Sequence, residues 1–445
     1  MNADTRVANA DTRDAIIGLG YVGLPLAMAL VDAGCTVTGV DASEARIADL
    51  RAGRSPIDDI PDERLAAALA GTFGVAHADE ADLAAPDALF VCVPTPITST
   101  KDPDLGPVLA AAERIRAELR VGQLVVLQST TFPGTTTGPF RGVLERSGLR
   151  AGIDFDLAFA PERINPGDPA SASRDVPRLV GGSTPAATAR AAALLRRIND
   201  RVVELSSPDA AEMAKLLENT FRNVNIAFVN QLALLCERMG LDVWEIIDAA
   251  ATKPFGFMKF TPGPGVGGHC IPVDPYYLSW RARAFDVTDR FIEAAGDINF
   301  AMPRHVVDLT AEALNERSKA LKGSRVAVIG VAFKPDVQDP RNSPAGAVLA
   351  GLVERGAEVR YHDPFVPQFR DDDGRDHTGV GLDSLIQWAD VFVVVTGHKA
   401  VDWDHLYASA DLVVDTVNSV RGRAIRERQV LRLGAGWTVP AAAGS

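Results

Sequence analysis

Three glycines near the start of the chain, Gly18, Gly20 and Gly23, limit the possible folds more than any other feature. They follow the apolar residues 15–17, which predict a strand, and lead into the apolar residues 24–33, which predict a helix. Glycines at this spacing allow a tight turn, close approach of a ligand to the backbone, and close packing of helix on strand. The pattern therefore predicts the first strand-turn-helix unit of a parallel α/β sheet.

An acidic residue, Asp41, closes the next predicted strand, near the ~20-residue offset at which such folds place a carboxylate. That carboxylate can bind both ribose hydroxyls of an adenosine and would repel a 2′-phosphate, while the helix N-terminus faces the phosphates. The Arg46 side chain either lies beside the adenine of that adenosine or is an exposed residue on a helix surface. We therefore predict NAD as the cofactor, held by Gly18, Gly20, Tyr21, Val22, Gly23 and Asp41.

Two regions of the chain alternate strand-like and helical patterns, which is typical of a parallel sheet. The first covers roughly the first 200 residues, and the second begins at residues 325–330. Helical patterns at 208–251 and 287–320 lie between them. Other strands are expected at 36–40, 88–93, 125–128, 157–160, 358–361, 391–395 and 412–415. The predicted fold class is α/β with a helical middle.

The composition excludes several classes of partner. The chain has 45 Lys and Arg against 58 Asp and Glu, and the net charge of −13 disfavours nucleic acid and anionic membranes. No apolar run reaches the ~18 residues of a membrane span. Residues 1–13 carry charges without an apolar core, so we expect a soluble, cytoplasmic protein. The densest basic run, residues 421–428, is predicted to lie on a C-terminal helix.

The four cysteines differ in their surroundings. Cys35, Cys92 and Cys236 lie in apolar contexts and are expected in the core. Their scattered positions argue against a disulfide framework or a zinc site and fit a reducing compartment. Cys270 instead lies in the Gly- and Pro-rich residues 252–277, which predict a long ordered loop, so a substrate can approach its thiol.

The neighbours of this thiol allow two further interpretations. An imidazole at His269 could lower the pKa of the Cys270 thiol. Because consecutive side chains often point apart, we interpret His269 as a loop contact. A metal site made of His269, Cys270 and Asp274 would lack a fourth ligand at a recognised spacing, so no metal is predicted.

A polar stripe is expected on the first middle helix, where Lys215, Asn219 and Asn223 recur every four residues. Spacing alone favours a solvated face. The alternative is a cleft, where an ammonium and an amide would stabilise an oxyanion. Lys334 follows the predicted strand 325–329, at the end where open sheets bind ligands, and is either a surface lysine or a phosphate contact.

These motifs together resemble the UDP-glucose/GDP-mannose dehydrogenase family over nearly the full chain, from Gly18 to Arg421. The most specific segment, residues 253–280, contains Gly267-Gly268-His269-Cys270-Ile271-Pro272-Val273-Asp274 and is similar to the branch acting on UDP-N-acetylhexosamines, especially UDP-N-acetylglucosamine. Cys92-Val93-Pro94-Thr95-Pro96-Ile97, with residues 102–105, indicates the same branch.

The resemblance implies two Rossmann-like doubly wound domains joined by a central helical dimerisation region. Residues 1–205 would bind NAD, residues 206–318 would form the helical region with the cysteine loop, and residues 319–445 would bind the UDP-sugar. It also implies a homodimer.

The resemblance further implies catalytic roles. Cys270 would be the nucleophile and Asp274 a base or a water-orienting group. Lys215 and Asn219 would stabilise an oxyanion at C6, and Glu162 would assist water or proton transfer. Thr130 would hold a water or touch the nicotinamide, with Thr95 and Arg46 as further cofactor contacts. The implied substrate contacts are Glu162, Arg163, Lys215, Asn219, Lys253, Lys259, Gly267, Lys334 and Arg421.

Two details limit this comparison. Relatives of the UDP-glucose type have a second acid where this chain has Pro166. The family also brings a basic residue from the partner subunit through the glycine loop, and both Lys253 and Lys259 are candidates.

The expected function is therefore an NAD-dependent, four-electron oxidation of a UDP-N-acetylhexosamine, with UDP-N-acetylglucosamine favoured, to the uronic acid through a Cys270 thioester. Its expected role is the supply of a surface polysaccharide precursor. The alternatives are the same chemistry on UDP-N-acetylmannosamine, UDP-N-acetylgalactosamine or UDP-glucose, a two-electron β-hydroxyacid dehydrogenase, and a catalytically silent nucleotide-sugar sensor.

Overall fold

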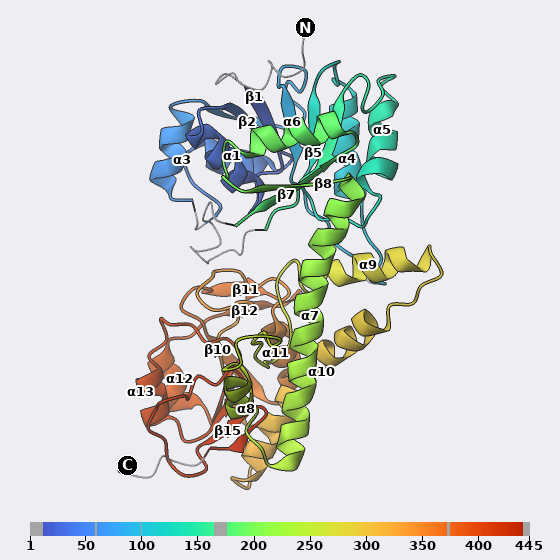
Figure 1. Ribbon diagram of the computed structural model, residues 1–445. Helices are drawn as coiled ribbons and strands as arrows, with labels where there is room; N and C mark the ends of the chain where they lie inside the picture. The colour runs from blue at the N-terminus through green and yellow to red at the C-terminus, as the bar shows by residue number, and fades with distance from the viewer. Residues whose placement is uncertain (1–11, 58–59, 99, 164–175, 372–373, 439–445) are drawn as a thin grey trace. The chain divides into compact units, whose positions relative to one another are not determined.

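The computed structural model describes residues 12–57, 60–98, 100–163, 176–371 and 374–438. The chain divides into two compact units, residues 1–218 with 276–287 and residues 219–275 with 288–445 (Figure 1). Pro166 and most of the charged N-terminal segment lie outside the described residues.

The first unit is built on an eight-stranded sheet with the order β3-β2-β1-β4-β5-β6-β7-β8. Neighbouring strands are parallel except β6 and β7, which are antiparallel. The strands are β1 (Arg13–Ile17), β2 (Thr36–Asp41), β3 (Phe73–His77), β4 (Ala88–Val91), β5 (Leu124–Leu127), β6 (Asp156–Phe159), β7 (Arg178–Gly182) and β8 (Val202–Leu205). Its first six strands have the doubly wound order, which confirms the predicted α/β fold.

Both faces of this sheet are apolar because helices cover each of them. Ile16 packs into one hydrophobic cluster, whereas its neighbours Ala15 and Ile17 pack into the cluster on the opposite face. The helices of this unit are α1 (Gly23–Asp32), α2 (Glu44–Arg51), α3 (Asp62–Leu69), α4 (Gly106–Arg116), the π-helix η2 (Thr136–Phe140), α5 (Arg141–Glu145) and α6 (Pro185–Leu195), with parts of α7 (Pro208–Met239) and α9 (Asp274–Arg283).

The second unit contains a six-stranded sheet with the order β10-β9-β13-β14-β15-β16. Its pairs are parallel except β15 with β16. The strands are β9 (Arg325–Ile329), β10 (Glu358–His362), β13 (Val391–Val394), β14 (Val413–Asp415), β15 (Val430–Arg432) and β16 (Gly436–Trp437), and β11 (Gln368–Arg370) pairs with β12 (Asp376–Thr378). The helices are α8 (Val243–Ala250), α10 (Arg290–Asn315), α11 (Pro344–Glu354), α12 (Leu382–Trp388) and α13 (Trp403–Ser409).

The structure changes several predicted boundaries. The helical pattern expected to reach residue 251 is two helices, because Gly240 adopts φ +69° and Asp242 caps α8. The C-terminal helix expected at 421–428 is wrong. Those residues form turns in which Gly422 and Arg428 have positive φ, and they connect β14 to β15.

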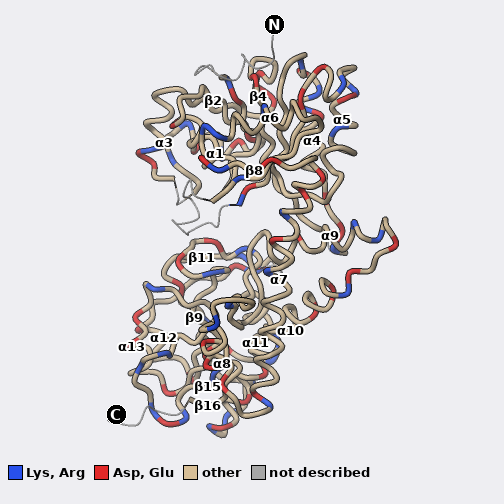
Figure 2. Tube along the Cα trace, in the orientation of Figure 1, with Lys and Arg blue, Asp and Glu red and all other residues tan. Residues whose placement is uncertain are grey.

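Acidic and basic residues are interspersed along both units (Figure 2). Within the described ranges, no helix combines the length and the apolar character that crossing a membrane requires.

Candidate active site

The glycine turn between β1 and α1 is closely packed except at its middle glycine. A Cβ added to Gly18, which has φ +96°, would lie 2.5 Å from the carbonyl oxygen of Cys92, and one added to Gly23 would strike the carbonyl oxygen of Gly18. At Gly20 the nearest atom is Arg46 Nη1, 3.9 Å away. Gly18 and Gly23 therefore serve packing, whereas Gly20 leaves the backbone open to a ligand.

The buried carboxylate of Asp41 lies at the end of β2, beside this turn. Its Oδ2 accepts a hydrogen bond from Leu19 N at 2.9 Å, and its Oδ1 accepts one from Ser43 N at 2.9 Å. Arg46 Nη1 lies 3.4 Å from Oδ2. Arg46 thus lies against the turn, and Tyr21 and Val22 lead into α1 half-buried. An open glycine, a helix N-terminus and a fixed carboxylate are the features that a dinucleotide requires, so these residues fit NAD.

The strand order of the first sheet reverses between β1 and β4, which is where such sheets bind ligands. The loops after β4 and β5 lie at this end of the sheet. Ser129 Oγ donates to the carbonyl oxygen of Val93 at 2.7 Å, which joins the two loops. Tyr277 Oη donates to Pro96 O at 3.0 Å, so α9 holds the loop that carries Thr95. The side chains of Thr95 and Thr130 are half-buried.

Glu162 follows β6, and its side chain is about one-tenth exposed. Its Oε2 accepts hydrogen bonds from Arg178 Nη1 at 2.9 Å and Gln128 Nε2 at 3.2 Å. Arg163 pairs with Glu218 on α7, with Nη2 and Oε1 2.6 Å apart. Glu162 and Arg163 therefore have different partners. Glu162 contacts side chains of β7 and of the residue after β5, and Arg163 contacts α7.

The polar stripe of α7 is buried, so the solvated face favoured by spacing alone is wrong. Lys215, Asn219 and Asn223 are 8%, 9% and 5% exposed. Asn219 Nδ2 donates to Asp274 Oδ2, whereas Asn223 Oδ1 accepts from Asn299 Nδ2 at 2.9 Å. Tertiary packing thus covers the polar face and leaves apolar residues of α7 exposed.

Cys270 is the exposed cysteine of the described chain, whereas Cys35, Cys92 and Cys236 are buried as predicted. Its carbonyl oxygen accepts from Asp274 N at 2.8 Å, so the buried Asp274 begins α9 one turn after the thiol. Among the described residues, no group of three or more His, Cys, Asp and Glu side chains is arranged to hold a metal ion.

The His269 side chain contacts two residues of the segment that follows β9. Its Nε2 lies 3.4 Å from Asp339 Oδ2, and its ring makes an edge contact with Phe333. Burial and the nearby Arg341 guanidinium lower the pKa of His269, which Asp339 only partly offsets. This agrees with its interpretation as a loop contact.

The glycines before Cys270 let the loop pack against the second sheet. A Cβ on Gly267 would lie 2.8 Å from the carbonyl oxygen of Asn342, and one on Gly268, at φ +90°, would lie 3.0 Å from the Phe333 ring. Farther up the loop, Gly263 N donates to Asn230 Oδ1 at 2.9 Å. Only glycine fits such close approaches.

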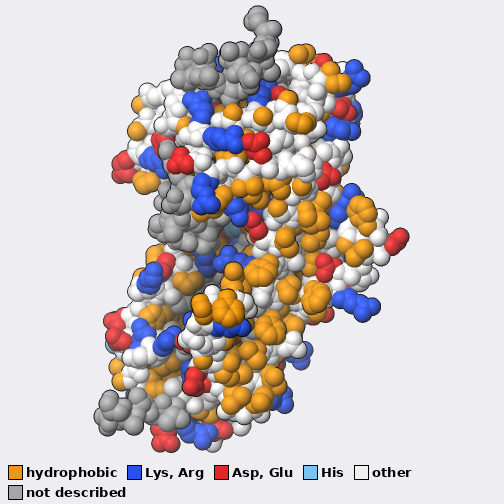
Figure 3. All heavy atoms as spheres, viewed as in Figure 1, with side chains coloured by type: hydrophobic (Ala, Val, Ile, Leu, Met, Phe, Trp, Pro, Cys, Tyr) orange, Lys and Arg blue, Asp and Glu red, His pale blue; other side chains and the backbone are white. Residues whose placement is uncertain are grey.

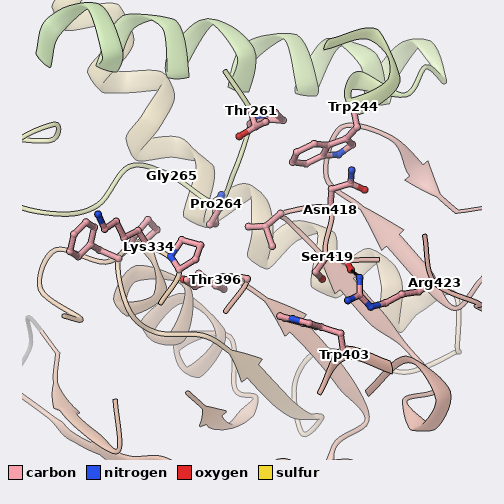
Figure 4. A pocket seen from close by; sticks show the side chains of 17 residues that line it. Trp244, Thr261, Pro264, Gly265, Lys334, Thr396, Trp403, Asn418, Ser419 and Arg423 are labelled. Atoms are coloured by element: carbon pink, nitrogen blue, oxygen red, sulfur yellow. Dashed lines mark hydrogen bonds between the residues drawn. The ribbon is translucent and has the colours of Figure 1, made fainter. Parts of the chain in front are cut away.

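A pocket of about 440 Å³ lies at the carboxyl ends of β9, β13 and β14 (Figure 4). Because β9 pairs with strands on both sides, β10 and β13, this is the switch point of the second sheet, where open α/β sheets bind ligands. Figure 4 shows Lys334 at one end of the pocket and Arg423 at the other. Lys334 therefore lines a pocket that is large enough for a ligand.

Sequence reasoning missed several residues of this pocket. They follow strand ends or come from α8 and α13, and they are Trp244, Trp403, Asn418, Ser419 and Arg423. The strand-end offset that singled out Lys334 also applies to Asn418 and Ser419, just after β14. No local sequence pattern indicated that the two tryptophans line a pocket.

Lys334 is the one predicted substrate contact among the described residues that line this pocket, and three of the others, all basic, have different neighbours. Arg421 Nη1 and Lys259 Nζ both pair with Asp248 on α8, at 2.8 and 2.5 Å. Lys253 lies in the exposed part of the loop, with its Nζ 4.8 Å from the centroid of the Phe255 ring.

Comparisons with known proteins agree with this geometry. The UDP-glucose/GDP-mannose dehydrogenase family models match at residues 12–199 (NAD binding domain), 209–301 (central domain) and 327–422 (UDP binding domain). UDP-N-acetyl-D-glucosamine 6-dehydrogenase from Pseudomonas aeruginosa is 39% identical over 360 residues, covering 80% of this chain and 83% of that protein. UDP-N-acetyl-D-mannosamine dehydrogenase from Pyrococcus horikoshii is 35% identical over 416 residues, covering 92% and 96%.

Solved structures show the same similarity. The structure of the Pyrococcus horikoshii UDP-D-ManNAc dehydrogenase gives a TM-score of 0.87 at 34% identity, covering 96% of this chain and all of that one. A UDP-glucose dehydrogenase from Pyrobaculum islandicum gives 0.83 at 30% identity, covering 96% and 98%. The chain therefore belongs to the UDP-glucose/GDP-mannose dehydrogenase family and is an NAD-dependent nucleotide-sugar dehydrogenase.

Proposed function

We propose that the enzyme oxidises C6 of UDP-N-acetylglucosamine twice, from alcohol to carboxylate, through a thioester on Cys270. Its product would be a precursor of a surface polysaccharide. The observation that best supports this chemistry is the exposed Cys270 thiol in a glycine-lined loop, one turn before the buried Asp274. A simple alcohol dehydrogenase has no use for a nucleophilic thiol.

In the first oxidation, Lys215 stabilises the alkoxide that develops at C6. Lys215 is 8% exposed and has no ion-pair partner in the part of the chain that the structure describes, which suits the binding of an oxyanion by its ammonium. The Asn219 amide acts with it, and Thr130 and Glu162 hold the water that takes the hydroxyl proton. NAD, when bound, accepts the hydride in each oxidation.

In the second oxidation, the thiolate of Cys270 adds to the C6 aldehyde and forms a thiohemiacetal. Loss of a second hydride gives the thioester. Water, oriented by Asp274 or Glu162, then adds to the thioester carbonyl, the C–S bond breaks, and the carboxylate and the free thiol remain. One alcohol, one water and two NAD⁺ are thereby converted to one carboxylate, two NADH and three protons.

The two strand-order switches support an assignment of the residues that hold the ligands. We assign NAD to Gly18, Gly20, Tyr21, Val22, Gly23, Asp41, Arg46, Thr95 and Thr130. We assign the UDP portion to the pocket in Figure 4, where Lys334 and Arg423 supply positive charge and Trp244 and Trp403 supply aromatic surface. Arg163, Gly267, Arg421 and either Lys253 or Lys259 remain proposed contacts to the sugar or the diphosphate.

We also propose three functional parts, residues 1–205, 206–318 and 319–445, and a homodimer formed through the middle part. Figure 3 shows hydrophobic side chains gathered over α7. They recur at a helical spacing and include Met213, Leu217, Phe221, Phe228, Leu235 and Met239, each more than 40% exposed. A continuous apolar stripe of this kind supports burial against a second copy.

The test is the amount of NADH released per sugar, with excess NAD and limiting UDP-N-acetylglucosamine, UDP-N-acetylmannosamine or UDP-glucose. Two NADH per UDP-N-acetylglucosamine, with slower turnover of the others, is expected. UDP-N-acetylmannosamine is the second candidate, because a relative acting on it matches 92% of this chain. One NADH per sugar would contradict the thioester, and Cys270→Ala is expected to abolish uronic acid formation.

A further inference from the structure

A buried carboxylate on α7 has no role in the chemistry above. Glu212 is 0% exposed and lies one turn before Lys215. Its Oε1 accepts hydrogen bonds from Thr136 N at 2.9 Å, Thr136 Oγ1 at 2.7 Å and Thr131 Oγ1 at 3.3 Å. Its Oε2 accepts one from Gly134 N at 2.7 Å. A single carboxylate therefore binds four donors from one loop.

The segment that surrounds Glu212 is residues 129–137, which comprise the loop after β5, with Thr130, and the start of η2. Helix α9 also holds this segment, since Arg281 Nε donates to Pro133 O at 2.9 Å and the centroid of the Trp280 ring lies 4.8 Å from that of Phe132. Gly134 has φ +96°, a conformation that glycine adopts readily, so the loop turns at this residue.

We infer that Glu212 is a positioning residue for the oxidation, because it fixes the loop bearing Thr130 to the turn of α7 bearing Lys215. This inference rests on the proposed roles of Thr130 and Lys215. An error of about 1 Å in such an arrangement can slow a reaction by about 100-fold. The carboxylate itself touches neither substrate nor cofactor.

The charge of Glu212 provides a readout of this role. Burial raises the pKa of Glu212 to about 7, although hydrogen bonds from Thr136 and Gly134 oppose that shift. Asp209, on the same helix, raises it further, and the Arg281 guanidinium lies beside Gly134. A protonated Glu212 would carry a hydroxyl donor on one carboxyl oxygen, which would face one of the two backbone N–H groups, so we expect turnover to fall as the pH drops through about 7.

The experiment compares Glu212→Gln and Glu212→Asp with the wild type in the full-length enzyme. In Glu212→Gln an amide NH₂ replaces Oε2 and faces Gly134 N–H, so that anchor is lost, whereas Glu212→Asp keeps the charge and tests partial rescue. Asp14→Asn is the matched control, because it also removes a buried carboxylate, at the start of β1.

The readouts are kcat, KM for NAD, the deuterium isotope effect with a sugar labelled at C6, and hydrogen exchange at the amides of Gly134 and Thr136. For Glu212→Gln we expect kcat to fall about 10- to 100-fold, with KM for NAD nearly unchanged, a larger isotope effect and faster exchange at both amides. The acid limb near pH 7 should disappear, and Glu212→Asp should recover part of kcat.

A wild-type kcat and isotope effect in Glu212→Gln would overturn the inference. So would a loss of kcat that matches the loss of folded protein with the isotope effect unchanged, because that is the behaviour of a purely structural residue. Failure of the wild type to oxidise any UDP-sugar would instead refute the proposed function, and the exchange measurement separates the two cases because it needs no sugar.

Discussion

The side-chain amide of Asn219 on α7 donates a 2.5 Å hydrogen bond to the carboxylate of Asp274, and both side chains are buried. Asp274 N in turn donates to the carbonyl oxygen of Cys270 at 2.8 Å. The amide on α7 thus fixes the residue whose backbone closes the turn after the thiol. A hydrogen bond to a buried charge is among the stronger single interactions in a protein.

Replacing Asn219 with alanine should therefore impair both stability and turnover. Removing a donor from a buried carboxylate costs about 1–3 kcal/mol in the free energy of unfolding. Urea denaturation and kcat measure the two effects. Asn225→Ala is the control, because Asn225 is only half-buried on the same helix and bonds only the carbonyl oxygen of Phe221 among the described groups. Equal losses of stability and kcat in the two variants would show that the hydrogen bond from Asn219 to Asp274 is not important for either property.

Asp41 should determine both the affinity and the choice of cofactor. Asp41→Ala removes the carboxylate proposed to bind the ribose hydroxyls, and losing such charged hydrogen bonds costs about 1.5–3 kcal/mol, or roughly 10- to 150-fold in Kd. Quenching of protein fluorescence by NADH and NADPH gives both values. The preference for NADH should shrink, since the repulsion of a 2′-phosphate is also lost. An unchanged Kd for NADH would show that the glycine turn holds the cofactor in another register.

Two arginines that are two positions apart in the sequence, Arg421 and Arg423, should differ in their effect on UDP binding. Arg423 lines the pocket, whereas Arg421 pairs with Asp248 and is not among the pocket residues. We expect Arg423→Ala to weaken UDP binding about 10-fold or more, as loss of a charged hydrogen bond does, and Arg421→Ala to weaken it less. Calorimetric titration with UDP measures both. The reverse order would favour the assignment made from the family resemblance.

Asp14 should make the protein less stable as the pH rises from about 4 to about 6. Neither of its carboxylate oxygens accepts a hydrogen bond within the described residues, and burial raises its pKa from 3.8 to about 6. The folded state therefore binds more protons than the unfolded state between these values, which costs about 3 kcal/mol once the pH exceeds 6.

Asp14→Asn should remove this dependence. Urea unfolding of the variant and the wild type at pH 4.5 and 7.5 tests it, with Asp79→Asn as the control because the Asp79 side chain is 87% exposed. The Asp14→Asn protein should gain stability relative to the wild type at the higher pH. A constant difference between the two proteins at both pH values would contradict the prediction.

Several features could be predicted from the sequence because they depend on residues close together in the chain. The turn at Gly18 follows from local backbone sterics and the apolar segments on either side. Asp41 follows from the length of one strand-helix-strand unit, and the exposure of Cys270 follows from the glycines and prolines around it, which prevent a helix. Lys334 was found by its position just after a strand.

Tertiary structure alone decided the rest. Helical spacing placed Lys215, Asn219 and Asn223 on one face, but could not say that packing buries that face. Glu212 gave no signal in the sequence, and Arg423 stood out only as part of a basic run, because the role of each depends on groups that the fold brings together from distant segments. Glu212, for example, contacts Thr136, 76 residues away. Burial and partner choice are properties of packed surfaces, whereas turns, strands and helix faces are properties of the local chain.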